Sequence, residues 1–407
     1  MSMKKYSLVL AGVAAHWLGA APAIAQTTTT VSCADTTILP NPVYLAGSSA
    51  FEPILAQLAV QIAAKQNVSV IYNPISSCTG VTAVADSTYS LSGTGHYYRV
   101  NATDNTKVDT LSCSITGGTK ALVGVSDVAY DSCMGEAKPV TLGEWRGPVQ
   151  SMLIIVPEAN VTTTNISAEQ AAAIWGCGDA GKVPPFTEKA CIQQRSASSG
   201  TQILVARNIG VPESAFKGTT NSSGGVLVQS LLACADPQAA IGFLAADSYA
   251  TQRGKLNALA FRGIKQKKAY YADSDANSVD KKNVRDGHYL IQGPLHFFSA
   301  LAAGSPAASA KYVLEWLTGK TPIDPKDVNN VNYITTVASL GDVPQCAMKV
   351  QLDKDGGKFS PYAPEVSCNC QFEKAVSAVS AAPASCKVCT TDVDCTGGKR
   401  CQTGFCE

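Results

Sequence analysis

The sequence carries almost no excess charge of either sign and has no basic block. Its 407 residues hold 32 Lys and Arg against 31 Asp and Glu, a formal net charge of +1, and only 15% of the residues are charged. Nucleic acids and anionic membrane surfaces are bound through clustered Lys and Arg, so this composition argues against both partners. Any specificity for an anion must therefore come from a local site.

The sequence also lacks the patterns of a membrane span or an active site. No stretch beyond residue 25 reaches the roughly 18 uninterrupted apolar residues of a membrane-spanning helix. No serine stands in a G-x-S-x-G elbow, no H-E-x-x-H occurs, and the histidines beyond residue 25 are only His96, His288 and His296. We therefore predict a protein that is not an enzyme and has no catalytic residue, metal site or cofactor. Packing is the expected role of His288 and His296.

The first residues have the order of segments typical of a cleaved secretory signal. Lys4 and Lys5 form a basic start, Leu8 to Ala15 form a short apolar run, and small residues precede the expected cleavage point at Ala25. Residues 1–25 are therefore predicted to be a signal peptide. The mature protein is expected to be periplasmic or secreted after cleavage near Ala25.

Fifteen cysteines fit an exported chain, because disulfides form in oxidising compartments. Their odd number leaves at least one cysteine unpaired or bonded to another chain. The sequence does not fix the pairing. Cys177 with Cys191, and Cys78 with Cys133, are the pairs to test first.

After residue 42 the chain alternates strand-like and helix-like segments, which is typical of an α/β fold. Strand patterns at Val43–Ala46 and Ser69–Tyr72 flank Phe51–Ala64, whose apolar residues have helical spacing. Further strands are predicted at Leu122–Val125, Met152–Val156 and Ala240–Leu244, and further helices at Ala168–Trp175, capped by Ser167, and Ile203–Asn208.

Three segments depart from this alternation. Residues 84–119, rich in Ser, Thr, Gly and Tyr, are predicted to form a hairpin excursion, and residues 371–385 are predicted to be a linker. Residues 386–407 hold five cysteines in 22 residues, too little chain for an apolar core, and are predicted to be a disulfide-rich module. Cys386 and Cys389 alone would suit a redox or zinc site, but the neighbouring cysteines favour structural disulfides.

Three short loops share small, hydroxyl-bearing residues, and each lies between a predicted strand and a predicted helix: GSSAF (47–51), SSCTG (76–80) and RSASSGT (195–201). The first N–H groups of a helix have no intrahelical acceptor and lie at the positive end of the helix dipole, so anions bind there. Arg195 adds a planar fork of donors that matches two oxygens of a phosphate. Helix capping explains any one such loop; with three in one chain, the pattern alone leaves anion binding and ordinary capping as equal alternatives.

Eight segments in order resemble the phosphate-binding components of bacterial phosphate ABC transporters, in the periplasmic type II binding-protein superfamily. They cover most of residues 43–320: LAGSSAFEPILAQLA (45–59), SSCTGVTAV (76–84), VGVSDVAY (123–130), MLIIVPEAN (152–160), ISAEQAAAIWG (166–176), RSASSGTQILVA (195–206), AIGFLAADSYA (240–250) and RDGHYLIQGPLHFF (285–298).

The resemblance implies a two-lobed fold with hinge strands and the ligand between the lobes. Lobe 1 is predicted at 40–125 and 285–345, and lobe 2 at 126–284. The ligand is expected to be inorganic phosphate or a related oxyanion, and the membrane component of an ABC transporter is a candidate partner. The residues carried over as ligand-binding are Ser49, Ala50, Phe51, Ser77, Asp127, Arg195, Ser199, Gly200 and Thr201.

Asp127 matches the ligand-facing carboxylate of the family. Phosphate near neutral pH carries a proton that a carboxylate can accept, whereas sulfate offers none. From the residue alone, a turn cap after a strand is the simpler role. The chain also departs from the family: Ala197 replaces an acidic residue that usually orients the arginine, and Ala50 supplies only backbone to the first loop.

The sequence therefore predicts an extracytoplasmic solute-binding protein for ABC-type uptake. The alternative is a secreted or surface adhesion or matrix protein that retains the binding scaffold, which the insertion at 84–119 and the cysteine-rich end favour. A secreted phosphohydrolase is a third hypothesis, disfavoured because the predicted site lacks a nucleophile and base pair.

Overall fold

The computed structural model describes residues 31–320, 327, 330–377 and 381–407. The predicted signal peptide, residues 1–25, lies outside these ranges. Among the described residues, no helix combines the length and the apolar character needed to cross a bilayer.

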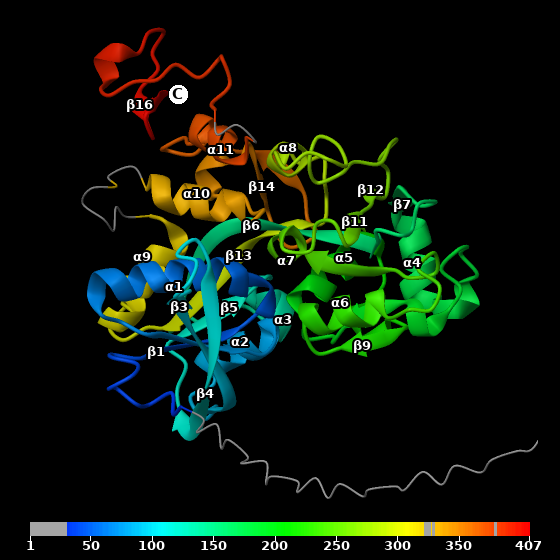
Figure 1. Cartoon of the computed structure of the whole chain (residues 1–407), viewed down its shortest axis with the longest axis horizontal. Coiled ribbons are helices and arrows are strands. Elements are labelled where there is room, and N and C mark those ends of the chain that lie inside the picture. Colours follow the sequence, from blue (N-terminus) through cyan, green and yellow to red (C-terminus); the bar gives the residue numbers. More distant parts are fainter. Residues whose placement is uncertain (1–30, 321–326, 328–329, 378–380) are drawn as a thin grey trace, which may run out of the picture. The chain divides into compact units, whose positions relative to one another are not determined.

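Most of the strands form one mixed sheet (Figure 1). Its order is β10-β6-β13-β5-β1-β2-β3-β4, and β11 also pairs with β6. Strand β1 lies between β2 and β5 and is parallel to both, whereas β13 is antiparallel to β5 and β6. The bounds are β1 Val43–Gly47, β2 Val70–Pro74, β3 Leu91–Val100, β4 Val108–Thr119, β5 Val123–Ser126, β6 Leu142–Pro157, β10 Gly242–Ala245, β11 Leu256–Ala258 and β13 Gln292–Ala300.

Strand β6 is longer than the sequence predicted. Residues between 142 and 151 pair with β13, and residues 152–155 pair with β10, so one strand joins two parts of the sheet. The predicted segment Met152–Val156 is only its second part, because Gly147 and Pro148 interrupt the apolar pattern before it. A Cβ on Gly147 would lie 2.4 Å from the ring of Phe297, so glycine allows β6 and β13 to pack closely there.

Helices follow the strands much as predicted. Ser167 caps α4 in a capping box with Gln170, which confirms the prediction for that helix. The long helix after β1 ends at Asn67, whose φ of 51° lies in the left-handed region. The bounds are α1 Glu52–Gln66, α2 Ser77–Ala85, α3 Tyr130–Met134, α4 Ala168–Cys177, α5 Gly200–Ile209, α6 Gly224–Leu232, α7 Ala246–Ala250, α8 Lys282–Arg285, α9 Ala308–Thr318, α10 Val331–Ser339 and α11 Asn369–Val376.

Four short strand pairs complete the secondary structure: β7 Asn165–Ser167 with β12 Ala260–Arg262, β8 Gln193–Arg195 with β9 Thr219–Asn221, β14 Val350–Leu352 with β15 Phe359–Pro361, and β16 Cys401–Gln402 with β17 Phe405–Cys406.

Aromatic side chains fill the core on both sides of β6. The rings of Phe51 and Phe297 lie 5.3 Å apart, and the Trp175 ring lies 5.3 Å from that of Phe243. Packing is confirmed for His296, which is buried and stacks on Phe298, whereas His288 is exposed and stacks on Tyr270 at 4.9 Å.

The insertion at 84–119 forms the predicted hairpin. Strands β3 and β4 pair antiparallel along most of their length, and Tyr72 pairs with His96 to join the hairpin to β2. A disulfide from Cys33 to Cys113 ties the start of the described chain to β4.

The cysteine pairing is partly as predicted. The bond between Cys78 and Cys133 is confirmed, whereas the prediction for Cys177 with Cys191 is wrong. Cys191 bonds Cys234, which follows α6, and α6 packs against the β8 strand that follows Cys191. Cys177 is exposed and carries a free thiol. The packing of α6 on β8, and not nearness in sequence, determines that Cys191 pairs with Cys234.

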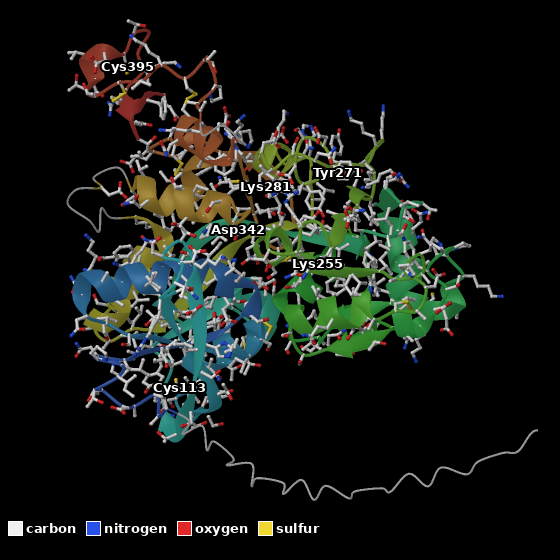
Figure 2. The ribbon with its side chains drawn as sticks, viewed as in Figure 1. Cys113, Lys255, Tyr271, Lys281, Asp342 and Cys395 are labelled. Carbon is white, nitrogen blue, oxygen red and sulfur yellow. A yellow bond between two sulfur atoms is a disulfide. The ribbon has the colours of Figure 1, made fainter. Side chains whose placement is uncertain are left out.

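The C-terminal region combines a helix with a disulfide-rich module, in which Cys395 is labelled in Figure 2. The predicted linker 371–385 is wrong in its first part, because α11 extends to Val376 and buries Phe372 completely. Residues 378–380 of that linker lie outside the described residues. Disulfides confirm the module; they are Cys346–Cys368 before it, Cys370–Cys386 at its start, and Cys389–Cys401 and Cys395–Cys406 within it.

Candidate functional site

The three predicted anion loops come together around one carboxyl group. The hydroxyl of Ser77, at the start of α2, donates to Oδ2 of Asp127 at 3.3 Å and accepts from the amide of Gly200 at 3.0 Å. The hydroxyl of Thr201, in the first turn of α5, donates to the same Oδ2 at 3.2 Å. The amide of Cys78 donates to the carbonyl of Ser198 at 3.2 Å. Loops far apart in sequence therefore meet at Asp127.

Glycine permits this close approach. A Cβ on Gly200 would lie 2.6 Å from Oγ of Ser77 and 2.8 Å from Cβ of Asp127. A Cβ on Gly80, one turn into α2, would lie 2.5 Å from Cα of Gly47. All three distances are shorter than the contacts that a Cβ atom makes in folded proteins. The close approach of the loops therefore requires glycine at positions 80 and 200.

Asp127 follows β5 and is almost completely buried, with 1% of its surface exposed. Burial raises the pKa of its carboxyl group, while hydrogen bonds from Ser48, Thr201 and Ser77 and the charge of Arg195 act in the opposite direction. Oδ2 is shared by the hydroxyls, whereas Oδ1 is buried and has no hydrogen-bond partner among the described residues. This carboxyl group has one oxygen left for a donor.

Arg195 ends β8 and is also buried, with 4% of its surface exposed. Its Nε donates to the carbonyl of Asn221 at 3.3 Å, and one terminal nitrogen donates to the carbonyl of Ser222 at 3.1 Å. These carbonyls hold the guanidinium in place. The backbone at the end of β9 therefore orients Arg195, as an acidic residue at position 197 would. Burial lowers the pKa of Arg195, and the charge of Asp127 opposes this shift.

The first loop is organised by residues that the sequence did not single out. The hydroxyl of Ser48 accepts from the amide of Ala50 at 3.2 Å, and the Tyr72 hydroxyl donates to the carbonyl of Ser48. The amide of Ala50, a predicted donor to the ligand, therefore has a partner within its own loop. Oγ of Ser49 is buried and has no partner within the described chain.

The side chains of Phe51 and Ser199, two other predicted ligand residues, make no hydrogen bond to any described residue at the site. The Phe51 ring lies in the core against Phe297, so only its backbone is available to the loop. Ser199 stands at the N-cap position of α5, but its side chain makes no cap hydrogen bond. Its carbonyl accepts the amide of Ile203 at 3.0 Å. Ser48 and Tyr72 were missed; Ser48 lies within the GSSAF loop, whereas nothing in the sequence marks Tyr72.

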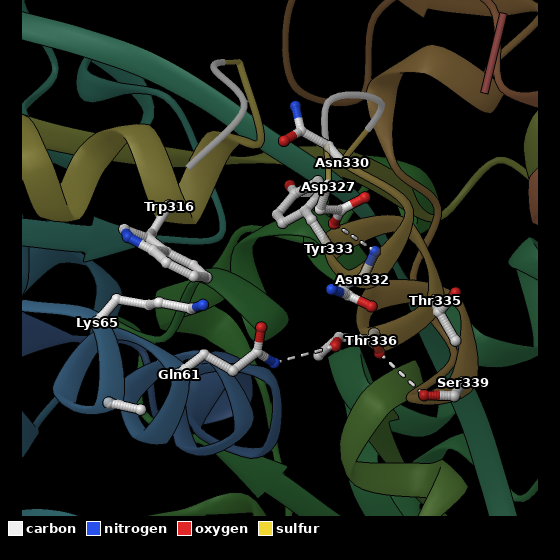
Figure 3. Close-up of a pocket in the computed structure, with 11 residues that line it drawn as sticks. Gln61, Lys65, Trp316, Asp327, Asn330, Asn332, Tyr333, Thr335, Thr336 and Ser339 are labelled. Carbon is white, nitrogen blue, oxygen red and sulfur yellow. Dashed lines mark hydrogen bonds between the residues drawn. The ribbon is translucent and has the colours of Figure 1, made fainter. Parts of the chain in front are cut away.

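A hollow lies elsewhere, between α1, α9 and α10 (Figure 3). It has a volume of about 410 Å³ and is lined by residues that include Gln61, Trp316 and Tyr333. None of the predicted ligand residues is among the described residues that line it, and the cluster around Asp127 remains the candidate site.

Comparisons with known proteins support the fold. No protein-family model matches the chain, and no curated protein matches it. Among solved structures, a putative phosphate ABC transporter substrate-binding protein with bound phosphate from Clostridium perfringens is 14% identical, with a TM-score of 0.50 over 75% of this chain and 99% of that one. An ABC-type phosphate transport receptor from Vibrio cholerae is 15% identical, with a TM-score of 0.46 over 74% and 99%.

A periplasmic molybdate-binding protein from Azotobacter vinelandii is 13% identical, with a TM-score of 0.37 over 74% of this chain and 98% of that one. The likeness to the Clostridium protein gives this chain the α/β fold of periplasmic binding proteins, extended by a disulfide-rich C-terminal module. At such low identity it establishes the fold alone, so the ligand has to be argued from the residues of the site.

Proposed function

We propose that this chain is an extracytoplasmic solute-binding protein that binds inorganic phosphate, or a similar tetrahedral oxyanion, between two lobes. The observation that carries the proposal is that the hydroxyls of Ser77 and Thr201 converge on Asp127 while the Gly200 amide donates to the same Ser77 hydroxyl, and that the charge of Arg195 acts on this buried carboxyl group. Hydroxyls, helix N-terminal amides and a guanidinium are the donors that an oxyanion requires. A binding role, and not catalysis, follows from this donor set.

Ser77 belongs to the proposed lobe 1, residues 40–125 and 285–345, whereas Arg195, Gly200 and Thr201 belong to the proposed lobe 2, residues 126–284. An oxyanion between them accepts hydrogen bonds from both lobes. These hydrogen bonds replace the direct contacts that the loops make with each other. The closed state then gains interactions that an open state lacks, and binding is coupled to hinge closure.

Asp127 gives this site its selectivity. Its unpartnered oxygen accepts a hydrogen bond from a ligand that carries a proton, such as hydrogen phosphate. A fully ionised anion such as sulfate has no proton to give, and the buried carboxylate repels it.

The disulfides favour an oxidising compartment, the periplasm or the outside of the cell. In the periplasm, delivery of the anion to an ABC-type transporter is the proposed role. The transporter would recognise the closed state, which forms only when the ligand is bound.

Calorimetric titration of the mature protein with phosphate, sulfate and molybdate tests the proposal. We expect phosphate to bind, Arg195→Ala to weaken its binding by at least 10-fold, and Asp127→Asn to relax the rejection of sulfate. Arg207→Ala, an exposed arginine on the same helix α5, is the matched control and should leave phosphate binding unchanged. If no oxyanion binds the wild-type protein, the proposal is wrong and the adhesion or matrix alternative takes its place.

A further inference from the structure

A second carboxyl group lies buried beside the candidate site and has no role in the function proposed above. Asp247 stands in the first turn of α7, directly after β10, and none of its surface is exposed. Helix α7 packs against β6, α1 and η1, the 3-10 turn Ser49–Phe51 of the first loop. The carboxyl group is therefore carried by an element that touches the loop at the N-terminus of α1.

The two oxygens of Asp247 differ in their surroundings. Oδ1 accepts the amide of Ser248 at 2.6 Å, whereas Oδ2 is buried and has no hydrogen-bond partner in the part of the chain that the structure describes. Oγ of Ser49 and Oδ1 of Asp127 are unpartnered in the same way. Buried polar atoms are normally hydrogen-bonded, and these three lie on the first loop and on two elements next to it, which fits a place where a polar ligand binds.

Electrostatic interactions tie Asp247 to this place. Burial and then the charge of Asp127 raise the pKa of Asp247 well above its usual value. The charges of Asp127 and Asp247 also contribute, after burial and Glu52, to the raised pKa of Tyr72, whose hydroxyl donates to the Ser48 carbonyl. The contacts of their elements place both acids beside the first loop: Asp127 follows β5, which pairs with β1, and the helix α7 that carries Asp247 contacts η1.

A further buried acid, Asp342, interacts electrostatically with Asp247; Figure 2 labels Asp342 together with Lys281. Oδ2 of Asp342 accepts from Nε2 of Gln150 at 3.3 Å, and the charge of Asp247 adds to burial in raising the pKa of Asp342. Nζ of Lys281 is 2.7 and 2.8 Å from the two oxygens of Asp273, and its charge acts on the pKa of Asp342 in the opposite direction to burial.

The balance of buried charge keeps Asp247 neutral. The charge of Arg195 acts on Asp127, and Glu52, the acid at the start of α1, is hydrogen-bonded to His96. An ionised carboxylate that is fully buried and unpaired is costly, so Asp247 holds a proton. A protonated carboxyl group is a hydrogen-bond donor as well as an acceptor.

We propose that Asp247, in its protonated form, donates a hydrogen bond to the bound oxyanion and so complements Asp127, which accepts one. This inference rests on the function proposed above. It assigns the two acids opposite roles in one site: Asp127 requires that the ligand carry a proton, and Asp247 adds a donor without adding a charge. The preferred ligand is then a partly protonated oxyanion of the phosphate or arsenate class.

Two substitutions of Asp247 test this by titration with inorganic phosphate. Asp247→Asn keeps a neutral donor of the same shape and should bind within about 3-fold of wild type, whereas Asp247→Leu should lose about 10-fold to 100-fold, the range for one hydrogen bond to a charged group. Asp342→Asn is the matched control, because Asp342 is a buried acid outside the proposed ligand residues. This variant should bind phosphate like wild type. Equal phosphate affinity for Asp247→Leu and wild type would overturn the inference.

The pH profile of phosphate binding separates this role from a structural one. This test compares wild type with Asp247→Asn, so it can be made even if Asp247→Leu does not fold. Wild type should lose affinity at alkaline pH more steeply than Asp247→Asn, because ionised Asp247 repels the anion and asparagine cannot ionise. Identical profiles would overturn the inference. If Arg195→Ala weakens binding while every Asp247 variant binds like wild type at all pH values, only the role of Asp247 is wrong. If wild type binds no oxyanion, the proposed function and this inference fall together.

Discussion

The Ser77 hydroxyl accepts a hydrogen bond from the amide of Gly200, 3.0 Å away and 123 positions further along the chain. This contact joins the N-terminus of α2 to the N-terminus of α5. It directs two helix ends, whose first amides have no intrahelical acceptor and which carry partial positive charge, toward the same carboxyl group of Asp127. The geometry of the candidate site therefore depends on how closely these two loops approach.

Adding one methyl group at this contact tests that dependence. In Gly200→Ala the new Cβ would lie 2.6 Å from Oγ of Ser77, so the loops must separate. We expect a loss of about 1 to 3 kcal/mol in the free energy of unfolding, typical of overpacking, together with weaker phosphate binding. Urea denaturation and calorimetry measure the two effects. Gly117→Ala is the control, because a Cβ there meets no atom within 4 Å, and equal stability of the two variants would contradict the tight contact.

The sequence predicted the parts of the site that local patterns encode. The GSSAF and RSASSGT loops follow strands and precede helices, so each could be recognised within a few residues, as could the cap Ser167 of α4 elsewhere in the fold. Arg195 was recognisable for the same reason. Its orientation was not, because the carbonyls that hold it belong to Asn221 and Ser222, which lie in a segment distant in sequence that pairs with β8.

What the sequence could not give depends on distant packing. The Cys191–Cys234 bond, the first part of β6 and the helix α11 all rest on partners that lie far along the chain. Asp247 was missed for the same reason: an acid in the first turn of a helix is normally a solvated cap, and only complete burial against the first loop changes that interpretation.

The disulfide between Cys78 and Cys133 should stabilise the fold. It links α2, next to the site, to α3 across a sequence separation of 55, which in the chain-entropy model is worth about 4 kcal/mol. Replacing both cysteines by serine should lower the free energy of unfolding by that order, measured with urea under non-reducing conditions. A loss below about 1 kcal/mol would show that the constraint on the unfolded chain contributes little here.

Cys177 is the expected site of thiol chemistry. It is exposed, and the other cysteines of the described chain are paired. A thiol reagent should therefore label one cysteine of the folded, unreduced protein, and Cys177→Ser should abolish the labelling without changing the unfolding curve. Labelling that survives this substitution would mean that one of the assigned disulfides is open in solution.

The ion pair of His96 with Glu52 should make stability depend on pH. Nδ1 of His96 lies 2.5 Å from the Glu52 carboxylate, and that hydrogen bond raises the pKa of the imidazole. A raised pKa in the folded state stabilises the protein fully below the unfolded pKa of about 6.5, and the effect disappears as pH rises through the folded value. Both side chains are partly exposed, so we expect less than about 1 kcal/mol.

We expect His96→Gln to cost more stability at pH 5.5 than at pH 8.5, as measured by urea unfolding at both values. The same substitution made in a Glu52→Gln background should show no such difference, because the charge that favours protonation of His96 is gone. A cost that is the same at both pH values in the wild-type background would contradict the ion pair.

The last residue of the chain should hold the disulfide-rich module against α11. The side chain of Glu407 accepts the amides of Asn369 and Cys370, at 2.9 and 2.7 Å, where the first turn of α11 has no intrahelical acceptors. An acidic side chain at a helix N-terminus also interacts favourably with the helix dipole. Glu407→Ala should therefore expose these amides and speed their hydrogen exchange, although the bond from Cys370 to Cys386 still tethers the module.

The exposed Glu365, replaced by alanine, is the control and should leave exchange in α11 unchanged. If the amides of residues 369 and 370 exchange equally slowly in both variants, the disulfide alone positions the module, and Glu407 contributes nothing to its attachment.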